Sequence, residues 1–257
     1  MSKNEHFSLK ELEKDLKPSI GDHIHNLIKI ILSSVPEIGG PATELFNTFI
    51  TPPLEKRRDE WIKIIALELS NLIEEYDLDV DALINNESFF TTLMHASQLA
   101  ILNHQKEKHE ALKNAVLNSA LPNSFEDDLK LIFLNYIDSF TVLHLKLLEF
   151  LNTQNSTELF NKLKHNVHYL EDINDDKDDL INEEIYAFEF WDVIHFIFLN
   201  SKSNKFLYVK IIKDLISNGL IVGEWPIEKF IVYIKNNSTT PNLTYLGEEF
   251  MKFIKSP

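Results

Sequence analysis

Glycine is scarce in this sequence. The six glycines among the 257 residues fall at positions 21, 39, 40, 219, 223 and 247, so the stretch from Ala42 to Asn218 contains none. Tight β-hairpin turns depend on residues that accept a positive φ angle, and glycine accepts it most readily. A sheet-rich domain is therefore excluded over this stretch, and the sequence predicts an all-α, or mainly α, protein.

Cysteine is absent altogether. Its absence excludes a disulfide framework, a thiolate metal site and a cysteine nucleophile. A basic start followed by an apolar leader is also missing, and the longest uncharged segment, Ser88 to Gln105, is interrupted by polar side chains. These patterns predict neither a signal peptide nor a membrane span, so we expect a cytoplasmic protein with no membrane partner.

Arginine is nearly absent, since Arg57 and Arg58 are the only two, and acidic residues dominate with a net charge of −15. The charge is uneven: residues 200–257 hold eight lysines and five acids, a balance of +3 that leaves −18 for residues 1–199. Bidentate recognition of phosphate or guanine depends on guanidinium groups. We therefore expect no nucleic-acid contact from the acidic part and only weak DNA contact from the basic part.

Apolar residues recur at helical spacing through the middle of the chain. One stripe at intervals of three and four consists of Trp61, Ile65, Leu69, Leu72 and Tyr76. The segment from Ser88 to Ala120 predicts one long helix or two collinear ones, ended by Pro122. Its expected inward residues are Phe89, Leu93, Ala96, Ala100, Ala111, Ala115 and Val116. Apolar stripes of this kind require partner helices.

A third helix is predicted after Ser124, a favourable N-cap residue. Its apolar positions alternate between spacings of four and three and are Leu129, Phe133, Tyr136, Phe140, Leu143, Leu147 and Phe150. Such a heptad-like seam, in a chain with short connections, favours an antiparallel helical bundle.

The chain is predicted to divide into four parts. Residues 1–51 carry short helices separated by prolines, 52–151 form the bundle, 152–184 combine a helix with an acidic linker, and 185–257 form a C-terminal module. In this module, the apolar run from Ile185 to Leu199 predicts a helix buried on most sides. Residues 205–218 predict a second helix, and 230–234 are rich in the β-branched and aromatic residues of a strand.

The acidic segment before residue 185 has the ligand spacing of a calcium-binding loop. Oxygen-bearing side chains stand at loop positions one, three, five, seven and twelve, as Asp172, Asn174, Asp176, Asp178 and Glu183. This spacing matches an EF-hand, but Lys177 stands where glycine makes the sharp turn, and Asp179 replaces the apolar residue that couples paired loops. A solvated acidic linker is the preferred interpretation, with a calcium site as the alternative.

A second metal hypothesis rests on His165 and His168, which are three residues apart and can share a helix face. With Glu171 or Asp172 they would offer zinc two imidazoles and one carboxylate. Surface histidines on a polar helix are the preferred interpretation, and no cofactor is expected.

The turn at residues 38–41, Ile-Gly-Gly-Pro, lies between two amphipathic segments. It can be interpreted as the tip of a membrane-inserting hairpin in a membrane-active helical protein. Glu37 and Glu44 flank the turn closely, and taking unpaired carboxylates into hydrocarbon is costly. An ordinary turn between helices is therefore the preferred interpretation.

Two short motifs near the C-terminus point to a known kind of module. The first, residues 215–221 with the sequence LISNGLI, ends a predicted helix at Gly219, which can adopt the left-handed conformation. The second, residues 243–247 with the sequence LTYLG, opens the last helix. Together they resemble the endings of winged-helix domains, as in the abortive-infection alpha family and similar bacterial proteins linked to phage exclusion.

The resemblance covers roughly residues 205–257. It implies a small winged-helix-like module with a short β-wing, and a recognition helix whose candidate nucleic-acid contacts are Lys205, Tyr208, Lys210 and Lys213. Residues 205–217 contain no arginine, asparagine or glutamine, the residues that usually read base edges. Protein contact is therefore expected from this module at least as readily as DNA contact.

The preferred function is that of a non-enzymatic, cytoplasmic protein-interaction protein of bacterial host defence or of a mobile element. Its expected partner is another protein or a second copy of the chain. The alternatives are a DNA-binding transcriptional regulator and a membrane-active helical protein. An enzyme ranks last, because the sequence alone places no nucleophile, base and orienting partner together.

Overall fold

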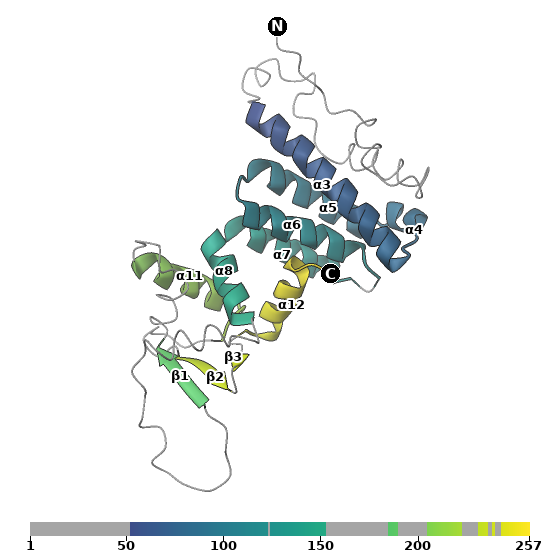
Figure 1. The fold of residues 1–257 in the computed structure, drawn as a ribbon. Coiled ribbons are helices and arrows are strands. Elements are labelled where there is room, and N and C mark those ends of the chain that lie inside the picture. Colours follow the sequence, from purple (N-terminus) through teal and green to yellow (C-terminus); the bar gives the residue numbers. More distant parts are fainter. Residues whose placement is uncertain are drawn as a thin grey trace, which may run out of the picture. The chain divides into compact units, whose positions relative to one another are not determined.

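The protein is described by a computed structural model that covers residues 52–122, 124–152, 185–189, 205–222, 231–235, 238–239 and 243–257. Over these residues the chain is mainly α-helical, which confirms the coarse fold prediction (Figure 1). The elements are α3 (Pro52–Tyr76), α4 (Val80–Ile84), α5 (Glu87–Leu102), α6 (Lys106–Ala120), α7 (Asp127–Ser139), α8 (Val142–Asn152), β1 (Ile185–Glu189), α11 (Lys205–Ser217), β2 (Ile231–Lys235), β3 (Ser238–Thr239) and α12 (Tyr245–Ile254).

The chain divides into two compact units. One unit extends to Phe140 and includes residues 252–257, and the other runs from Thr141 to Met251. Helix α12 therefore contributes its first seven residues to the second unit and its last three to the first. The predicted parts 1–51 and 152–184 lie outside the described residues, and the four predicted ranges stay predictions.

The first unit is a helical bundle in which α5 contacts α3, α6 and α7 (Figure 1). The stripe predicted on α3 is buried except at its end, where Tyr76 is 45% exposed. All the inward positions predicted for α5 and α6 are buried as well. The predicted amphipathic pattern is thus confirmed, and burial of this apolar surface is the main force that holds the bundle together.

Helices α5 and α6 are not collinear, which corrects one of the two arrangements predicted for residues 88–120. They pack against each other and are joined by residues 103–105. The backbone of Asn103 is extended, with φ −90° and ψ 150°, and its side-chain Nδ2 donates to the Leu99 carbonyl at 3.3 Å. This extended residue ends the helical hydrogen-bond ladder, and alanines on both helices leave room for close packing.

The helix predicted from Ser124 to Phe150 is wrong as a single element, because the chain forms two helices there. Helix α7 ends at Ser139, and Phe140 is extended with φ −75° and ψ 145°. The N-cap of α7 is Glu126, with no side-chain capping hydrogen bond, so the predicted cap at Ser124 is wrong too. Apolar spacing alone did not reveal this break, since the seam continues in phase across it.

The end of α12 completes the core of the first unit. Phe253 is fully buried, and its ring centroid lies 5.2 Å from that of Phe125 and 5.4 Å from that of Phe133. Asn118 on α6 donates from Nδ2 to the carbonyls of Lys252, Phe253 and Lys255 at 3.2, 3.0 and 2.7 Å. These bonds satisfy carbonyl groups that the last turn of a helix leaves without intrahelical partners.

The second unit contains an antiparallel sheet in the order β1-β2-β3. The register pairs Ile185 with Lys235 and Glu189 with Ile231, and Ile234 with Thr239. The strand predicted at residues 230–234 is present as β2. The helix predicted from Ile185 is wrong over residues 185–189, which form β1, because periodicity does not distinguish a short apolar strand from a buried helix.

Candidate functional site

Helix α11 holds the four residues that the sequence singled out for nucleic-acid contact. Lys205 is its first residue, and Lys210 and Lys213 are exposed. Tyr208 is only 6% exposed, which corrects its place among the surface contacts. The ammonium of Lys210 is paired with Asp214 one turn further along the helix. The positive charge available on this face is therefore smaller than the lysine count suggests.

Asp214 also faces α8 of the same unit. Its Oδ2 lies 3.4 Å from Nε2 of His144, whose side chain is buried. Nδ1 of His144 accepts the backbone N–H of Thr141 at 3.1 Å, so the neutral ring carries its proton on Nε2, toward the carboxylate. Sequence reasoning missed this contact, because nothing in the local pattern joins residues so far apart in the chain.

The C-terminus of α11 has the capping geometry that Gly219 predicted. Gly219 has φ 69°, in the left-handed region. The N–H of Leu220 donates to the Leu215 carbonyl at 3.0 Å, and the N–H of Gly219 donates to the Ile216 carbonyl at 2.9 Å. This pair of bonds is a Schellman motif, in which glycine avoids the steric cost of the left-handed conformation.

The two C-terminal motifs are bonded to each other. The N–H of Thr244 donates to the Leu220 carbonyl at 3.0 Å, and the Thr244 hydroxyl donates to the Gly219 carbonyl. The same hydroxyl oxygen accepts the N–H of Gly247 at 3.0 Å and so caps α12. Their residues are therefore explained by local structure rather than by contact with a ligand.

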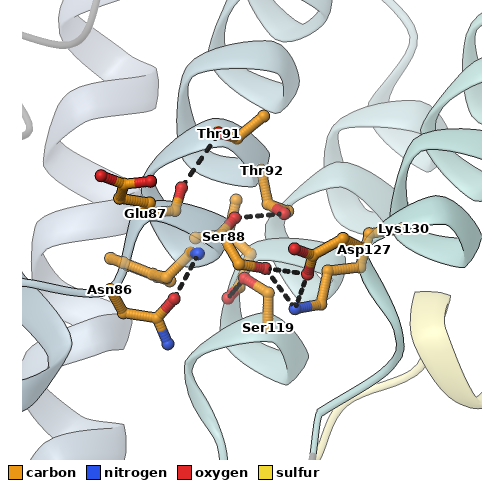
Figure 2. A network of polar contacts seen from close by, with 10 residues as sticks. Asn86, Glu87, Ser88, Thr91, Thr92, Ser119, Asp127 and Lys130 are labelled. Carbon is orange, nitrogen blue, oxygen red and sulfur yellow. Dashed lines mark hydrogen bonds and ion pairs between the residues drawn. The ribbon is translucent and has the colours of Figure 1, made fainter.

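A polar network in the bundle joins α5 to α7 (Figure 2). Lys130, which is 4% exposed, donates from Nζ to Ser88 Oγ at 2.7 Å, and the Ser88 hydroxyl donates to Asp127 Oδ1. Lys130 Nζ also lies 3.4 Å from Asp127 Oδ1. Sequence reasoning missed this trio, for which only the spacing of Asp127 and Lys130 gave a local signal.

The trio brings together a hydroxyl, an amine and a carboxylate, which are the groups of nucleophilic catalysis. The direction of the bonds argues for a structural role. Lys130 donates to Ser88 instead of accepting its proton, and the hydrogen bond from Ser88, together with Lys130, holds the pKa of Asp127 below its ordinary value. A carboxylate with a lowered pKa is a weaker base, so the network holds two helices together.

A cavity of about 600 Å³ lies between α3, the α5–α6 connection and α6, all within the first unit. Its cationic and imidazole lining consists of Lys56, Arg57, Lys106, Lys113, His104 and His109. Two acids, Glu60 and Glu110, and the apolar residues Pro53, Trp61 and Ile64 complete the wall. No pattern in the sequence pointed to this cavity, because its residues come from separate helices.

Packing fixes several of the side chains around the cavity. Arg57 Nη1 donates to the carbonyls of Ile101, Leu102 and Asn103 at 3.0, 3.3 and 3.2 Å, where its charge compensates the C-terminus of α5. Trp61 Nε1 donates to Ser97 Oγ at 2.9 Å. His109 contacts the edge of Trp61 with ring centroids 6.0 Å apart. The cavity therefore has preorganised walls.

The two metal hypotheses fall on residues that the structure does not describe. Asp172, Asn174, Asp176, Asp178 and Glu183 lie outside the described ranges, as do His165, His168 and the turn at residues 38–41. Within the described residues, no group of three or more histidine or acidic side chains is placed to hold a metal ion.

None of the described helices has both the length and the apolar character that crossing a membrane requires. No family model matches the chain, and neither the curated proteins nor the solved structures searched include a match to it.

Proposed function

We propose that this chain is a non-enzymatic protein-interaction protein of the bacterial cytoplasm, acting in host defence, and that its C-terminal module docks a partner protein. The observation that carries the proposal is the start of α11, where Phe206 is 79% exposed and Leu207 is 41% exposed. A large aromatic side chain on an exposed helix face is typical of a protein contact and gives no attraction to phosphate.

The module is proposed to have a winged-helix-like arrangement. Helix α11 would be its recognition helix, the antiparallel pair β2 and β3 its wing, and α12 its closing helix. The bonded motifs around Gly219 and Thr244 support this assignment, since they stand at the two points where the resembled domains leave and re-enter helix.

The proposed partner is a protein that offers an apolar recess flanked by carboxylates. Phe206 and Leu207 supply apolar surface, and Lys213 adds positive charge from the same helix. Residues 200–257 carry a balance of +3, so complementary charge on the partner would be acidic. Double-stranded DNA fits this face less well, because Lys210 is already paired with Asp214 and the helix has no arginine.

Site-specific photo-cross-linking tests the proposal. The photoreactive residue p-benzoylphenylalanine replaces Phe206 in the full-length protein, produced in its native cells, and replaces Tyr76 of α3 in a matched control. Tyr76 is also an exposed aromatic, but it belongs to the first unit. We expect one discrete protein adduct from position 206 that position 76 does not give.

The adduct partner is then identified by mass spectrometry, purified and titrated against the full-length protein. Phe206→Ala should weaken its binding by about tenfold or more, as truncation of a buried aromatic anchor does, while Tyr76→Ala should not. Cross-linking of position 206 to DNA would overturn the proposal in favour of a regulator. Cross-linking to a second copy of the chain would replace the acidic partner by self-association.

A further inference from the structure

The charge around the cavity of the bundle is opposite to that of its surroundings. Residues 52–140 contain eight basic and sixteen acidic residues. Four of the eight basic residues line the cavity, but only two of the sixteen acidic residues do. A cavity that gathers cations in an acidic unit presents a local positive potential, and a concave site with apolar walls focuses it.

Both acids of the cavity are already compensated. Glu60 lies 3.6 Å from Lys56 Nζ, and Glu110 lies 2.6 Å from Lys113 Nζ. The two remaining cations are Arg57, which holds the end of α5, and Lys106. Among the described residues Lys106 has no ion-pair partner, so its charge is available to an anion that enters the cavity.

The rest of the lining selects the body of the ligand. Pro53, Trp61 and Ile64 form an apolar wall, and Ile64 is 40% exposed. A volume of about 600 Å³ is within the range of cavities that hold small organic molecules. An inorganic anion alone would leave this apolar wall in contact with water.

The kind of cation selects the anionic group. The guanidinium of Arg57 is used by three carbonyls, so the charges left for a ligand belong to lysine ammonium groups. Ammonium groups act as point charges and attract a doubly charged phosphate more strongly than a singly charged carboxylate. We propose that the cavity binds a phosphate monoester whose apolar body is about the size of a nucleoside.

Calorimetric titration of the full-length protein with three probes tests this proposal. The probes are adenosine monophosphate, which has both features, adenosine, which has only the body, and inorganic phosphate, which has only the charge. We expect saturable binding of adenosine monophosphate at least about tenfold tighter than that of either fragment. Equal affinity for adenosine, or no saturable heat with adenosine monophosphate up to millimolar concentration, would overturn the proposal.

Lys106→Glu is the decisive variant, with Lys63→Glu as its matched control. Lys63 is an exposed lysine of α3 that does not line the cavity. Lys106 is in the first turn of α6, where an acidic residue stabilises a helix, so the variant keeps its fold. We expect Lys106→Glu to weaken binding about tenfold and Lys63→Glu to leave it unchanged. Equal effects of the two variants would contradict a local site.

A spectroscopic readout locates the bound probe. In protein labelled with 5-fluorotryptophan, the fluorine resonance of Trp61 is assigned by its loss in a Trp61→Phe variant. We expect adenosine monophosphate to shift this resonance with the same midpoint as the calorimetric titration. A shift confined to the other tryptophan resonances would place binding elsewhere and would overturn the proposal.

Discussion

Gly247 packs directly against the carbonyl group of Leu220. A Cβ atom added to Gly247 would overlap the carbonyl oxygen of Leu220 and lie 3.0 Å from its carbonyl carbon. The atoms in the way are backbone, which cannot move aside as a flexible side chain can. The close approach brings the start of α12 against the residue that follows the cap of α11.

We expect Gly247→Ala to lower the free energy of unfolding by about 1 to 3 kcal/mol, the usual cost of forcing extra volume into packed structure. Urea denaturation followed by circular dichroism measures the loss. Ser217→Ala on the exposed side of α11 is the control and should stay close to wild type. A Gly247→Ala protein as stable as the control would contradict the close approach.

Gly219 tests a different cost, that of backbone conformation. Because its φ is 69°, Gly219→Ala should destabilise the protein by about 1 to 2 kcal/mol. Gly219→Asn should lose less, since asparagine tolerates the left-handed region better than alanine does. Chemical denaturation of both variants checks this order, and equal losses for alanine and asparagine would argue against a strained backbone.

The Ser88 network predicts a coupled effect on stability. Ser88→Ala removes a hydrogen-bond partner from the buried ammonium of Lys130 and should cost about 1 to 3 kcal/mol. In a double-mutant cycle with Lys130→Met, the two changes should couple by about 0.5 kcal/mol or more. Ser139→Ala, an exposed serine of α7, is the control. Additive losses would show that Ser88 and Lys130 do not interact.

The pKa of Asp127 gives a second test of this network. The Ser88 hydrogen bond is the largest cause of its lowered pKa, and Lys130 lowers the pKa further. A lowered pKa means that its contribution to stability is present above the unfolded value of about 3.9 and is lost as the pH falls through the folded value. Carbon-13 NMR of the carboxyl group should give a midpoint below that value in the native protein.

The same titration in Ser88→Ala should move the Asp127 midpoint upward, toward the ordinary range, because the largest cause of the shift is gone. Ser139→Ala should leave it unchanged. An Asp127 midpoint in the ordinary range in the native protein would rule out the network as described.

The helices were largely predictable from sequence, because the stripe of α3 and the inward residues of α5 and α6 follow helical periodicity. The breaks at Asn103 and Phe140 were not, since each is a local change of ψ inside a pattern that stays in phase. The strand at residues 185–189 depends on pairing with β2, a distant segment. Tertiary pairing of this kind overrides local propensity.

The candidate sites were less predictable than the helices. Gly219 announced its own cap, because its chemistry is local. Ser88 and Lys130 meet only after α5 and α7 have packed, and Lys106 joins Lys56 only across two helices. A single sequence carries no local signal for such meetings, so these sites required the structure.

The division of α12 between the two units has a consequence for the order of synthesis. Phe253 fills the core of the first unit, and Asn118 binds the carbonyls around it. Residues up to Phe140 leave the ribosome long before residues 252–257 do. The bundle must therefore wait, with an open place beside Phe125 and Phe133, until the whole second unit has been translated. During that interval it is a nascent chain with exposed apolar surface, the kind of state that chaperones bind.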